Sequence, residues 1–274
     1  MKFAIVASNQ EKYCDLKTLD IAIQEAESRG FDSFLLWDHY MLPDGNQTHD
    51  PFILLTHLAA KTSKIRLGTC VTPIPMRPPA VLAKMVSTLD ILSKGRVILG
   101  VGAGWYAQEF RAYSEWDNDR TRVARTREGL DLITRLWIQD KVNFNGKHYQ
   151  AVDAILEPKP TQKPYPELWF GTSSTKMLDL AAKYGTGWIP VNVSATEYKQ
   201  GKIKILENLR KLRRKQKLTM AYFGDPEKNS TETVKMIENY QKAGCEYFAV
   251  AWLHPKEKFV QEVKKFAEDV MASF

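Results

Sequence analysis

Hydrophobic positions along the chain alternate between short runs typical of buried strands and longer stretches with helical spacing. The first run, Lys2–Ser8, is rich in Phe, Ala, Ile and Val and lacks regular polar alternation, as expected for a strand buried on both faces. Asp15–Arg29 then spaces its apolar residues as a helix does, and Gly30 follows, a residue favoured just beyond a helix C-terminus. Asp50 and Pro51 supply the N-cap and first-turn residues of a second helix.

This strand–helix order recurs along the whole chain. We predict strands at Lys2–Ser8, Phe31–Trp37, Lys64–Thr72, Arg96–Val101, Leu168–Gly171, Gly187–Val191, Leu218–Phe223 and Cys245–Leu253. We predict the helices that follow them at Asp15–Arg29, Phe52–Lys61, Ala80–Leu92, Thr121–Trp137, Thr175–Tyr184, Thr196–Lys215, Thr231–Ala243 and Lys256–Met271. Such alternation implies right-handed βαβ units and a parallel sheet. Eight units in 274 residues favour an α/β fold of the (β/α)8 TIM barrel type, with one domain spanning residues 1–274.

One stretch interrupts the alternation, between the fourth helix and the fifth strand. Within Asp140–Pro166, the segment VNFNGKHYQ has an Asn-Gly turn flanked by alternating residues, which indicates a small hairpin. The segment EPKPTQKPYP that follows indicates an extended, Pro-rich connection. A run of prolines is also typical of a domain linker, but strand–helix alternation resumes at once, which favours an insertion in a single domain.

The composition excludes several classes of protein. Hydrophobic residues make up 44% of the chain and charged residues 26%, which is normal for a globular protein and excludes disorder of the whole chain. No apolar run reaches the roughly 20 residues that a membrane helix needs. The N-terminal apolar run ends at Ser8, too early for a signal peptide. Cys14, Cys70 and Cys245 are too far apart to suggest a disulfide framework or a metal site, so we expect a reduced, cytoplasmic protein.

The net charge of +7 is concentrated in one segment. Residues 195–217 contain nine basic and two acidic side chains, so this segment alone accounts for the net charge. Ile205, Leu209 and Leu212 within it have helical spacing, which favours an outer helix with a solvent-exposed basic face. An anion-binding role is the alternative. Aromatic residues do not alternate with the bases as single-strand nucleic-acid binding requires, and we expect neither nucleic acid nor a membrane as partner.

Candidate chemistry follows the predicted strands, because barrels of this kind carry their active sites at the carboxyl ends of the strands. The second strand is followed by the sequence WDHY at residues 37–40, where the carboxylate of Asp38 and the imidazole of His39 can bind a ligand and move a proton near neutral pH. The alternative is that Asp38 caps a turn and His39 is structural. After the fifth strand, GTSST at residues 171–175 leads into a helix, which favours phosphate binding or ordinary N-capping.

Alternate glycines end the fourth strand, in the sequence GVGAGW at residues 100–105. The third glycine comes one residue too early for the dinucleotide fingerprint G-x-G-x-x-G. Alternate glycines at the end of a strand do let a flat ring approach the backbone closely. No Walker A motif and no zinc-type histidine spacing occur, so we predict no metal. Cys70 has no histidine nearby in sequence, which gives no support to a thiol nucleophile.

Taken together, these segments resemble the bacterial luciferase-like superfamily of flavin- and deazaflavin-dependent oxidoreductases. The resemblance covers nearly the whole chain. The segments that carry it are GFDSFLLWDHY (Gly30–Tyr40), the long block from KIRLGTCVTPIPMRPPA to GVGAGWYAQEF (Lys64–Phe110), RTREGLDLITRLW (Arg125–Trp137), EPKPTQKPYPELWFGTSS (Glu157–Ser174) and YGTGWIP (Tyr184–Pro190).

The resemblance implies a (β/α)8 barrel that binds either FMN or the deazaflavin coenzyme F420, with Asp38 and His39 beside the ring. The family commonly has a strand bulge with a non-prolyl cis peptide, which would fall at Cys70–Val71. The cofactor-binding residues that the resemblance implies are Asp38, Thr69, Cys70, Val71, Thr72, Gly102, Ala103, Gly104, Gly171, Thr172, Ser173 and Ser174, the last four of them at the phosphate.

Three departures from the family affect the expected chemistry. Trp105 stands where sugar-phosphate dehydrogenases of the family have a glutamate, so that proton donor is missing. Glu109, one helical turn on, is the remaining candidate acid. The frequent Asp-Gly-Trp of the sixth strand is Thr-Gly-Trp at residues 186–188, and the segment between strands six and seven is short, which indicates a small substrate-covering insertion.

The function we predict is hydride transfer between coenzyme F420 and a small organic substrate. The predicted catalytic residues are His39, which would move the accompanying proton, Asp38, which would orient it or bind the ring, and Glu109. The WDHY sequence is similar to that of deazaflavin members and favours F420. The alternatives are an FMN-dependent monooxygenase that uses reduced flavin and oxygen, a non-catalytic flavin-binding protein, and an anion-binding module built on the basic helix. Relatives often dimerise through early helices, which makes a homodimer an expectation, and the substrate is left open.

Overall fold

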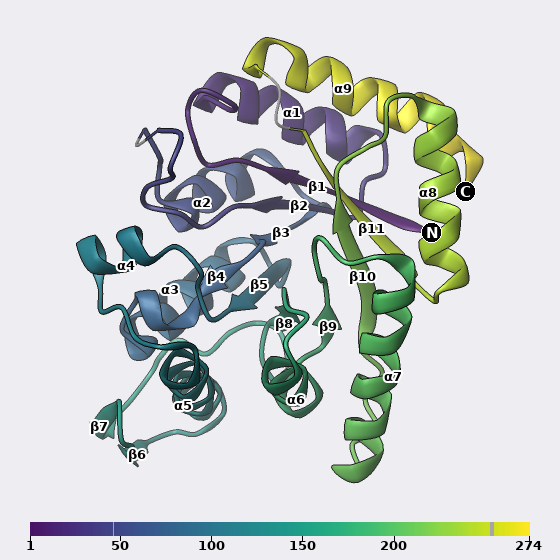
Figure 1. The fold of residues 1–274 in the computed structure, drawn as a ribbon. Coiled ribbons are helices and arrows are strands. Elements are labelled where there is room, and N and C mark those ends of the chain that lie inside the picture. The colour runs from purple at the N-terminus through teal and green to yellow at the C-terminus, as the bar shows by residue number, and fades with distance from the viewer. Residues whose placement is uncertain (46, 253–254) are drawn as a thin grey trace.

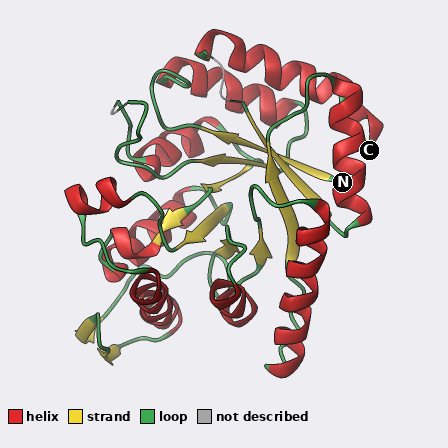
Figure 2. Ribbon diagram, in the orientation of Figure 1, coloured by secondary structure: helices red, strands yellow, loops and turns green. Residues whose placement is uncertain are grey.

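The structure is a computed structural model that describes residues 1–45, 47–252 and 255–274. Parallel strands form a closed barrel within a ring of helices (Figures 1 and 2). The barrel strands are β1 (Lys2–Ala7), β2 (Ser33–Leu36), β3 (Arg66–Thr69), β5 (Val97–Gly102), β8 (Glu167–Phe170), β9 (Gly187–Trp188), β10 (Thr219–Gly224) and β11 (Tyr247–Ala251). Each pairs with the next, β11 pairs with β1, and β3 pairs with β5. A short strand, β4 (Thr72–Pro73), continues β3 along β5. The predicted (β/α)8 barrel is confirmed.

Within the described residues, eight outer helices surround the barrel, and several of them begin at side-chain caps that the sequence encodes. They are α1 (Leu16–Ser28), α2 (Pro51–Lys61), α3 (Pro79–Leu92), α5 (Asp119–Ile138), α6 (Thr175–Tyr184), α7 (Ala195–Lys211), α8 (Ser230–Lys242) and α9 (Lys256–Asp269). Asp15, Asp50 and Asn118 each accept a hydrogen bond from an N–H group of the first turn that would otherwise lack a partner. Ser194 and Glu197 form a capping box on α7. None of the described helices is long and apolar enough to span a membrane.

The predicted insertion is a two-stranded antiparallel hairpin, β6 (Val142–Asn145) and β7 (Gln150–Ala154), outside the barrel beside α5 (Figure 1). The carboxylate of Glu128 on α5 accepts hydrogen bonds from the backbone N–H groups of residues 147–149 and so attaches the hairpin to the helix. The Pro-rich connection that follows has cis peptide bonds before Pro158 and Pro164. β5 and β8, the barrel strands before and after this insertion, pair directly with each other, so the insertion does not interrupt the barrel.

Several predicted boundaries were wrong. The helix predicted to reach Lys215 ends at Lys211, because Arg213 has a left-handed backbone with φ of 52°. The third strand is interrupted at Cys70–Val71, and the sixth is only two residues long. The last strand ends at Ala251, and the predicted end at Leu253 lies outside the described residues. We predicted no separate helix over the residues of α4 (Ala107–Tyr113), whose N-cap residue, Tyr106, forms no side-chain cap. Short 3-10 turns lie at Ile74–Met76 and Met271–Ser273.

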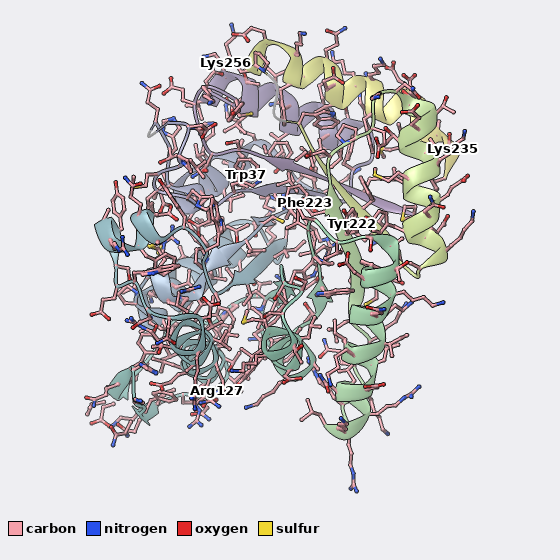
Figure 3. The ribbon with its side chains drawn as sticks, in the orientation of Figure 1. Trp37, Arg127, Tyr222, Phe223, Lys235 and Lys256 are labelled. Atoms are coloured by element: carbon pink, nitrogen blue, oxygen red, sulfur yellow. The ribbon has the colours of Figure 1, made fainter. Side chains whose placement is uncertain are left out.

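The barrel interior has an apolar core of its own, separate from the layer between strands and helices. It is made of Ala4, Val6, Leu35, Cys70, Ile98, Trp169, Ile189, Ala221, Tyr247, Ala249 and Ala251. Trp37, Val71 and Phe223 are only partly buried and pack against this core. Trp37 and Phe223 lie near the centre of the ring of strands, whereas Lys235 and Lys256 lie on its outer helices (Figure 3).

A charged network closes the end of the barrel at which the strands begin. The guanidinium of Arg66 on β3 forms ion pairs with Asp32 and, at 2.7 Å, with Glu167 on β8. It also lies 5.3 Å from the ring of Trp169. Tyr247 donates a hydrogen bond of 3.0 Å to Asp32. Burial opposes the charge on Asp32, but Arg66 and its other partners outweigh it and hold the pKa of that carboxyl below its usual range.

Replacing Arg66 by Met should lower the free energy of unfolding by roughly 3 kcal/mol, because two partly buried carboxylates lose their shared cation. Chemical denaturation measures the change. The matched control is Lys217→Met, which removes an ion pair to Glu246 whose lysine is largely exposed and should change the free energy by less than about 1 kcal/mol. Equal effects of the two substitutions would contradict a structural role for the Arg66 network.

Candidate active site

A cavity of about 720 Å³ opens at the carboxyl ends of the strands. Its wall combines residues of the strand ends with the first turns of α5 and α6. The lining residues are Trp37, His39, Leu42, Cys70, Val71, Pro73, Gly102, Ala103, Gly104, Trp105, Asp119, Arg120, Arg122, Val123, Gly171, Thr172, Ser174, Thr175, Lys176, Met177, Ile189, Val191, Asn192 and Phe223. The cavity therefore lies where the sequence predicted function.

The bulge between β3 and β4 forms part of the cavity wall, and its Cys70–Val71 peptide bond is cis, as the resemblance implied. Gly102 of β5 and Gly171, which directly follows β8, leave room for the Val71 side chain. A Cβ atom added to Gly102 would lie 2.8 Å from a methyl group of Val71, and one added to Gly171 would lie 2.7 Å away. The alternate glycines thus admit a side chain of this chain, a role that we had not predicted. Burial raises the pKa of the Cys70 thiol to about 12, which keeps it neutral.

The imidazole of His39 is held by a buried carboxylate. Its Nδ1 lies 3.1 Å from Oε2 of Glu109, on α4, and the Glu109 side chain is only 1% exposed. Glu109 also accepts hydrogen bonds from the backbone N–H groups of Tyr40, at 2.6 Å, and Met41. Because a carboxylate can only accept, Nδ1 of His39 carries the proton in this pair, and Nε2 remains the nitrogen available to a ligand.

Asp38 does not line the cavity. Its two oxygens accept a bidentate pair of hydrogen bonds from Arg77, at 2.7 and 2.8 Å, and Arg77 also contacts Asp50 at 3.1 Å. Arg77 is 6% exposed, and burial opposes its charge, but the carboxylates outweigh this and raise its pKa. Asp38 therefore ties the loop after β2 to the segment before α3 and to the N-terminus of α2, rather than orienting His39.

Two more side chains fix the backbone around His39. The amide of Asn9, two residues beyond β1, donates hydrogen bonds of 2.7 Å to the carbonyl groups of His39 and His49. Thr48 donates one of 2.6 Å to the carbonyl of Tyr40. The loop after β2 is thus held by polar groups of several different elements, which orders His39 before any ligand arrives.

The opposite part of the cavity has the features of an anion site. Ser174 is the N-cap residue of α6, yet its side chain makes no capping hydrogen bond. The hydroxyl of Thr172 instead accepts from the N–H of Ser174 at 3.2 Å. Lys176 and Arg120 project from the first turns of α6 and α5, and no ion pair is formed by either within the described part of the chain. Helix N–H groups, hydroxyls and cations together suit a phosphate.

The structure brings most of the predicted site residues together. Those that line the cavity are His39, Cys70, Val71, Gly102, Ala103, Gly104, Gly171, Thr172 and Ser174. Those that do not are Asp38, Glu109, Thr69, Thr72 and Ser173. Thr72 donates to the Thr69 hydroxyl at 2.8 Å behind the bulge. Among the described residues, no group of three His, Cys, Asp or Glu side chains is placed to hold a metal ion.

Sequence reasoning missed several lining residues. Trp37 and Trp105 stand inside motifs that it singled out, and their size next to a candidate histidine and a glycine turn was a usable signal. Arg120 and Lys176 lie in the first turns of helices, but no pattern marked them as belonging to the cavity. Phe223 ends a strand that looked like ordinary core.

Comparisons with known proteins identify the family to which the chain is similar. A family model described as luciferase-like monooxygenase matches residues 1–251. The F420-dependent glucose-6-phosphate dehydrogenase of Kineococcus radiotolerans is 36% identical over 185 residues, which cover 66% of this chain and 54% of that protein. The FMNH(2)-dependent dimethylsulfone monooxygenase of Pseudomonas putida is 32% identical over 176 residues, covering 64% of this chain and 48% of that protein. This chain spans about half the length of these relatives.

The same fold occurs in solved structures. An F420-dependent secondary alcohol dehydrogenase, in complex with an F420-acetone adduct, superposes with a TM-score of 0.86 at 23% sequence identity. The match covers 100% of this chain and 99% of that one. At this level of identity the similarity establishes the architecture.

Replacing Gly102 by Ala should destabilise the protein by roughly 1–3 kcal/mol, because the new methyl group overlaps Val71. Thermal and chemical denaturation measure the loss. The matched control is the double variant Gly102→Ala with Val71→Ala, which removes the methyl groups in conflict and should recover part of the stability. A double variant less stable than the sum of the two single changes would contradict this packing of Val71.

Proposed function

Because the chain belongs to the luciferase-like monooxygenase family, we propose that it is an oxidoreductase that moves a hydride between a flavin-type cofactor and a small organic substrate. The family matches the resemblance found in the sequence. The observation that carries the proposal is a single cavity with two unlike parts: a histidine held by a buried carboxylate, and an uncapped helix N-terminus with two cations.

The residues of this chain fit such a cofactor. The start of α6, with Thr172, Ser174 and Lys176, would hold the phosphate. The bulge at Val71 and the backbone of Gly102 and Gly104 would border the ring, with Trp37 and Phe223 on the apolar surface below. When bound, the ring supplies the position that accepts or donates hydride.

We propose coenzyme F420 as the cofactor and FMN as the alternative. The WDHY sequence favours F420, and relatives of both kinds match this chain at similar identity. Arg120 and Lys176 both lack an ion pair within the described residues, which suits a cofactor with more than one anionic group. With FMN, the reaction would be oxygenation by reduced flavin and oxygen, as the family description suggests.

The proton that accompanies the hydride is assigned to His39. With its Nδ1–H donated to Glu109, neutral His39 accepts a proton at Nε2, and the imidazolium that forms faces a buried carboxylate. In the reverse direction, the same nitrogen donates the proton. Glu109 acts through His39 and does not line the cavity, so it is a positioning residue in this proposal. Asp38 is also assigned a positioning role, through Arg77.

Titration of the protein with FMN and with coenzyme F420, followed by absorbance, tests the function and selects the cofactor. We expect saturable binding of F420 with a spectral shift. Tighter binding of FMN would replace F420 by the alternative, and binding of neither would contradict the proposed function.

A matched pair of variants locates the phosphate in the same titration. Ser174→Asp should weaken cofactor binding about tenfold or more, because it places a negative charge at the proposed phosphate site. Ser173→Asp changes the exposed neighbour that does not line the cavity and should have a smaller effect. Equal effects of the two substitutions would contradict a phosphate site at Thr172 and Ser174.

His39→Ala should lower turnover at least about tenfold without changing the cofactor dissociation constant, because it removes only the proton transfer. Glu109→Gln should lower turnover in the same way, since the imidazolium loses its carboxylate. The double variant should be no slower than His39→Ala, because Glu109 works only through His39. Steady-state kinetics and the cofactor titration measure both quantities, and additive losses in the double variant would contradict the pairing.

A further inference from the structure

A second cavity, of about 620 Å³, lies near the end of the barrel at which the strands begin. The second half of α7, the first residues of β10 and the turn before β11 form its walls. Figure 1 shows α7 running beside β10. The cavity of the candidate active site opens at the carboxyl ends of the strands and shares no lining residue with this one. The second cavity is therefore a separate site, which the proposed function does not use.

Part of the wall of the second cavity is apolar. Leu209 on α7, and Leu218 and Met220 at the start of β10, line it and are buried in the core. Leu206, almost one turn before Leu209 on α7, also lines the cavity but is 38% exposed. An apolar group that entered the cavity would remove this surface from water, which is favourable.

The rest of the wall is strongly basic. Six basic side chains and one acidic side chain line the cavity, namely Lys202, Arg210, Arg213, Arg214, Lys215, Lys217 and Glu246. Six positive charges and one negative charge give +5, which is most of the +7 of the whole chain. Glu246 pairs with Lys217 at 2.8 Å, and the other five cations form no ion pair within the described part of the chain. The cavity therefore offers several unpaired cations to an anion.

The end of α7 explains only part of this charge. Arg210 lies in its last turn, where a cation complements the helix dipole. Lys202 lies well before that turn, and Lys217 comes two residues before β10, so the dipole does not account for them. The Nζ atom of Lys202 donates a hydrogen bond of 3.2 Å to the carbonyl of Gly244, across the cavity from α7. The basic side chains thus come from several elements and converge on one space.

One of these cations is partly buried without a carboxylate. The guanidinium of Arg214 donates a hydrogen bond of 3.0 Å to the carbonyl of Ala182. Burial lowers the pKa of Arg214, and Tyr165, rather than a carboxylate, counteracts this. An anion that binds beside a partly desolvated cation stabilises its charge, because the two charges attract more strongly away from water.

We propose that the second cavity binds a free amphipathic anion, a molecule with an apolar chain and a carboxylate, sulfate or phosphate group at one end. The chain covers Leu206 and Leu209, and the anionic group lies among Arg210, Arg213 and Lys215. The described lining contains no aromatic residue on which the bases of a nucleic acid would stack. Walls from three elements admit a single molecule, whereas the surface of a bilayer contacts only groups that protrude.

Three probes test the class of ligand by calorimetry. Decanoate, used below its aggregation concentration, has both a chain and an anionic group. Decyltrimethylammonium has the same chain with the opposite charge, and inorganic phosphate has no chain. We expect decanoate to bind at least about tenfold more tightly than either of the other two. Absence of decanoate binding, or phosphate or decyltrimethylammonium binding as tightly as decanoate, overturns the proposal.

A triple variant locates the anionic group. Arg210→Gln, Arg213→Gln and Lys215→Gln together remove three unpaired cations of the cavity and should weaken decanoate binding at least about tenfold. Thermal denaturation of the variant shows that it is folded, since these side chains are exposed and form no ion pairs among the described residues.

The matched control removes three other cations of α7. Lys199→Gln, Lys204→Gln and Lys211→Gln change the net charge by the same amount but do not line the cavity, and the affinity for decanoate should stay within about twofold. Equal losses in the two triple variants would mean that decanoate responds only to the overall charge of the helix, and would overturn the proposal.

Two further measurements exclude other places of binding. Lys176→Gln changes the candidate active site and should leave decanoate binding unchanged, so a loss of decanoate binding in this variant would place decanoate in the first cavity and overturn the proposal. Phosphatidylglycerol vesicles present the same chemistry as a bilayer. Binding of these vesicles without binding of free decanoate would assign the basic residues to a membrane surface and also overturn it. None of these outcomes depends on which cofactor the protein uses.

Discussion

The close approach of β5 to β3 and β4 is the constraint on which the rest of the structure depends. A Cβ atom on Gly68 would collide with the carbonyl oxygen of Ile98, and one on Gly100 with that of Thr69. Glycine at these two positions lets the sheet close on itself. Closure brings the bulge at Val71 against β5 and β8 and sets that part of the cavity wall. The close packing that closes the barrel therefore also shapes the wall of the cavity.

Buried carboxylates order the loop that carries His39. Asp38 and Asp50 share Arg77, and Glu109 is satisfied by His39 and two backbone N–H groups. Each charge would be costly to bury alone, so its partners must keep their places, and the loop is ordered as a consequence. Positioning of the imidazole thus has an electrostatic origin.

Most of the fold follows from patterns within short stretches of sequence. Alternation of buried runs and amphipathic stretches predicted the barrel, the hairpin insertion and the strand ends that carry the cavity. The capping residue Asp50 marked a helix start, because a cap acts within a few residues. The seven-residue α4 begins at Tyr106 without a side-chain cap and had no such mark. For that reason it was not among the predicted helices.

By itself the sequence determined the barrel, the family resemblance and the placing of His39 at the end of β2. Tertiary structure decided which groups meet. His39 and Glu109 are separated by 70 residues, and Asp38 and Arg77 by 39, so no local spacing connects them. Alternate glycines in a sequence look the same whether they make room for a cofactor ring or for a side chain of the protein. Only closure of the barrel placed Val71 against them. Periodicity reports which face of an element is buried, whereas the partner on the other side depends on how distant strand ends come together.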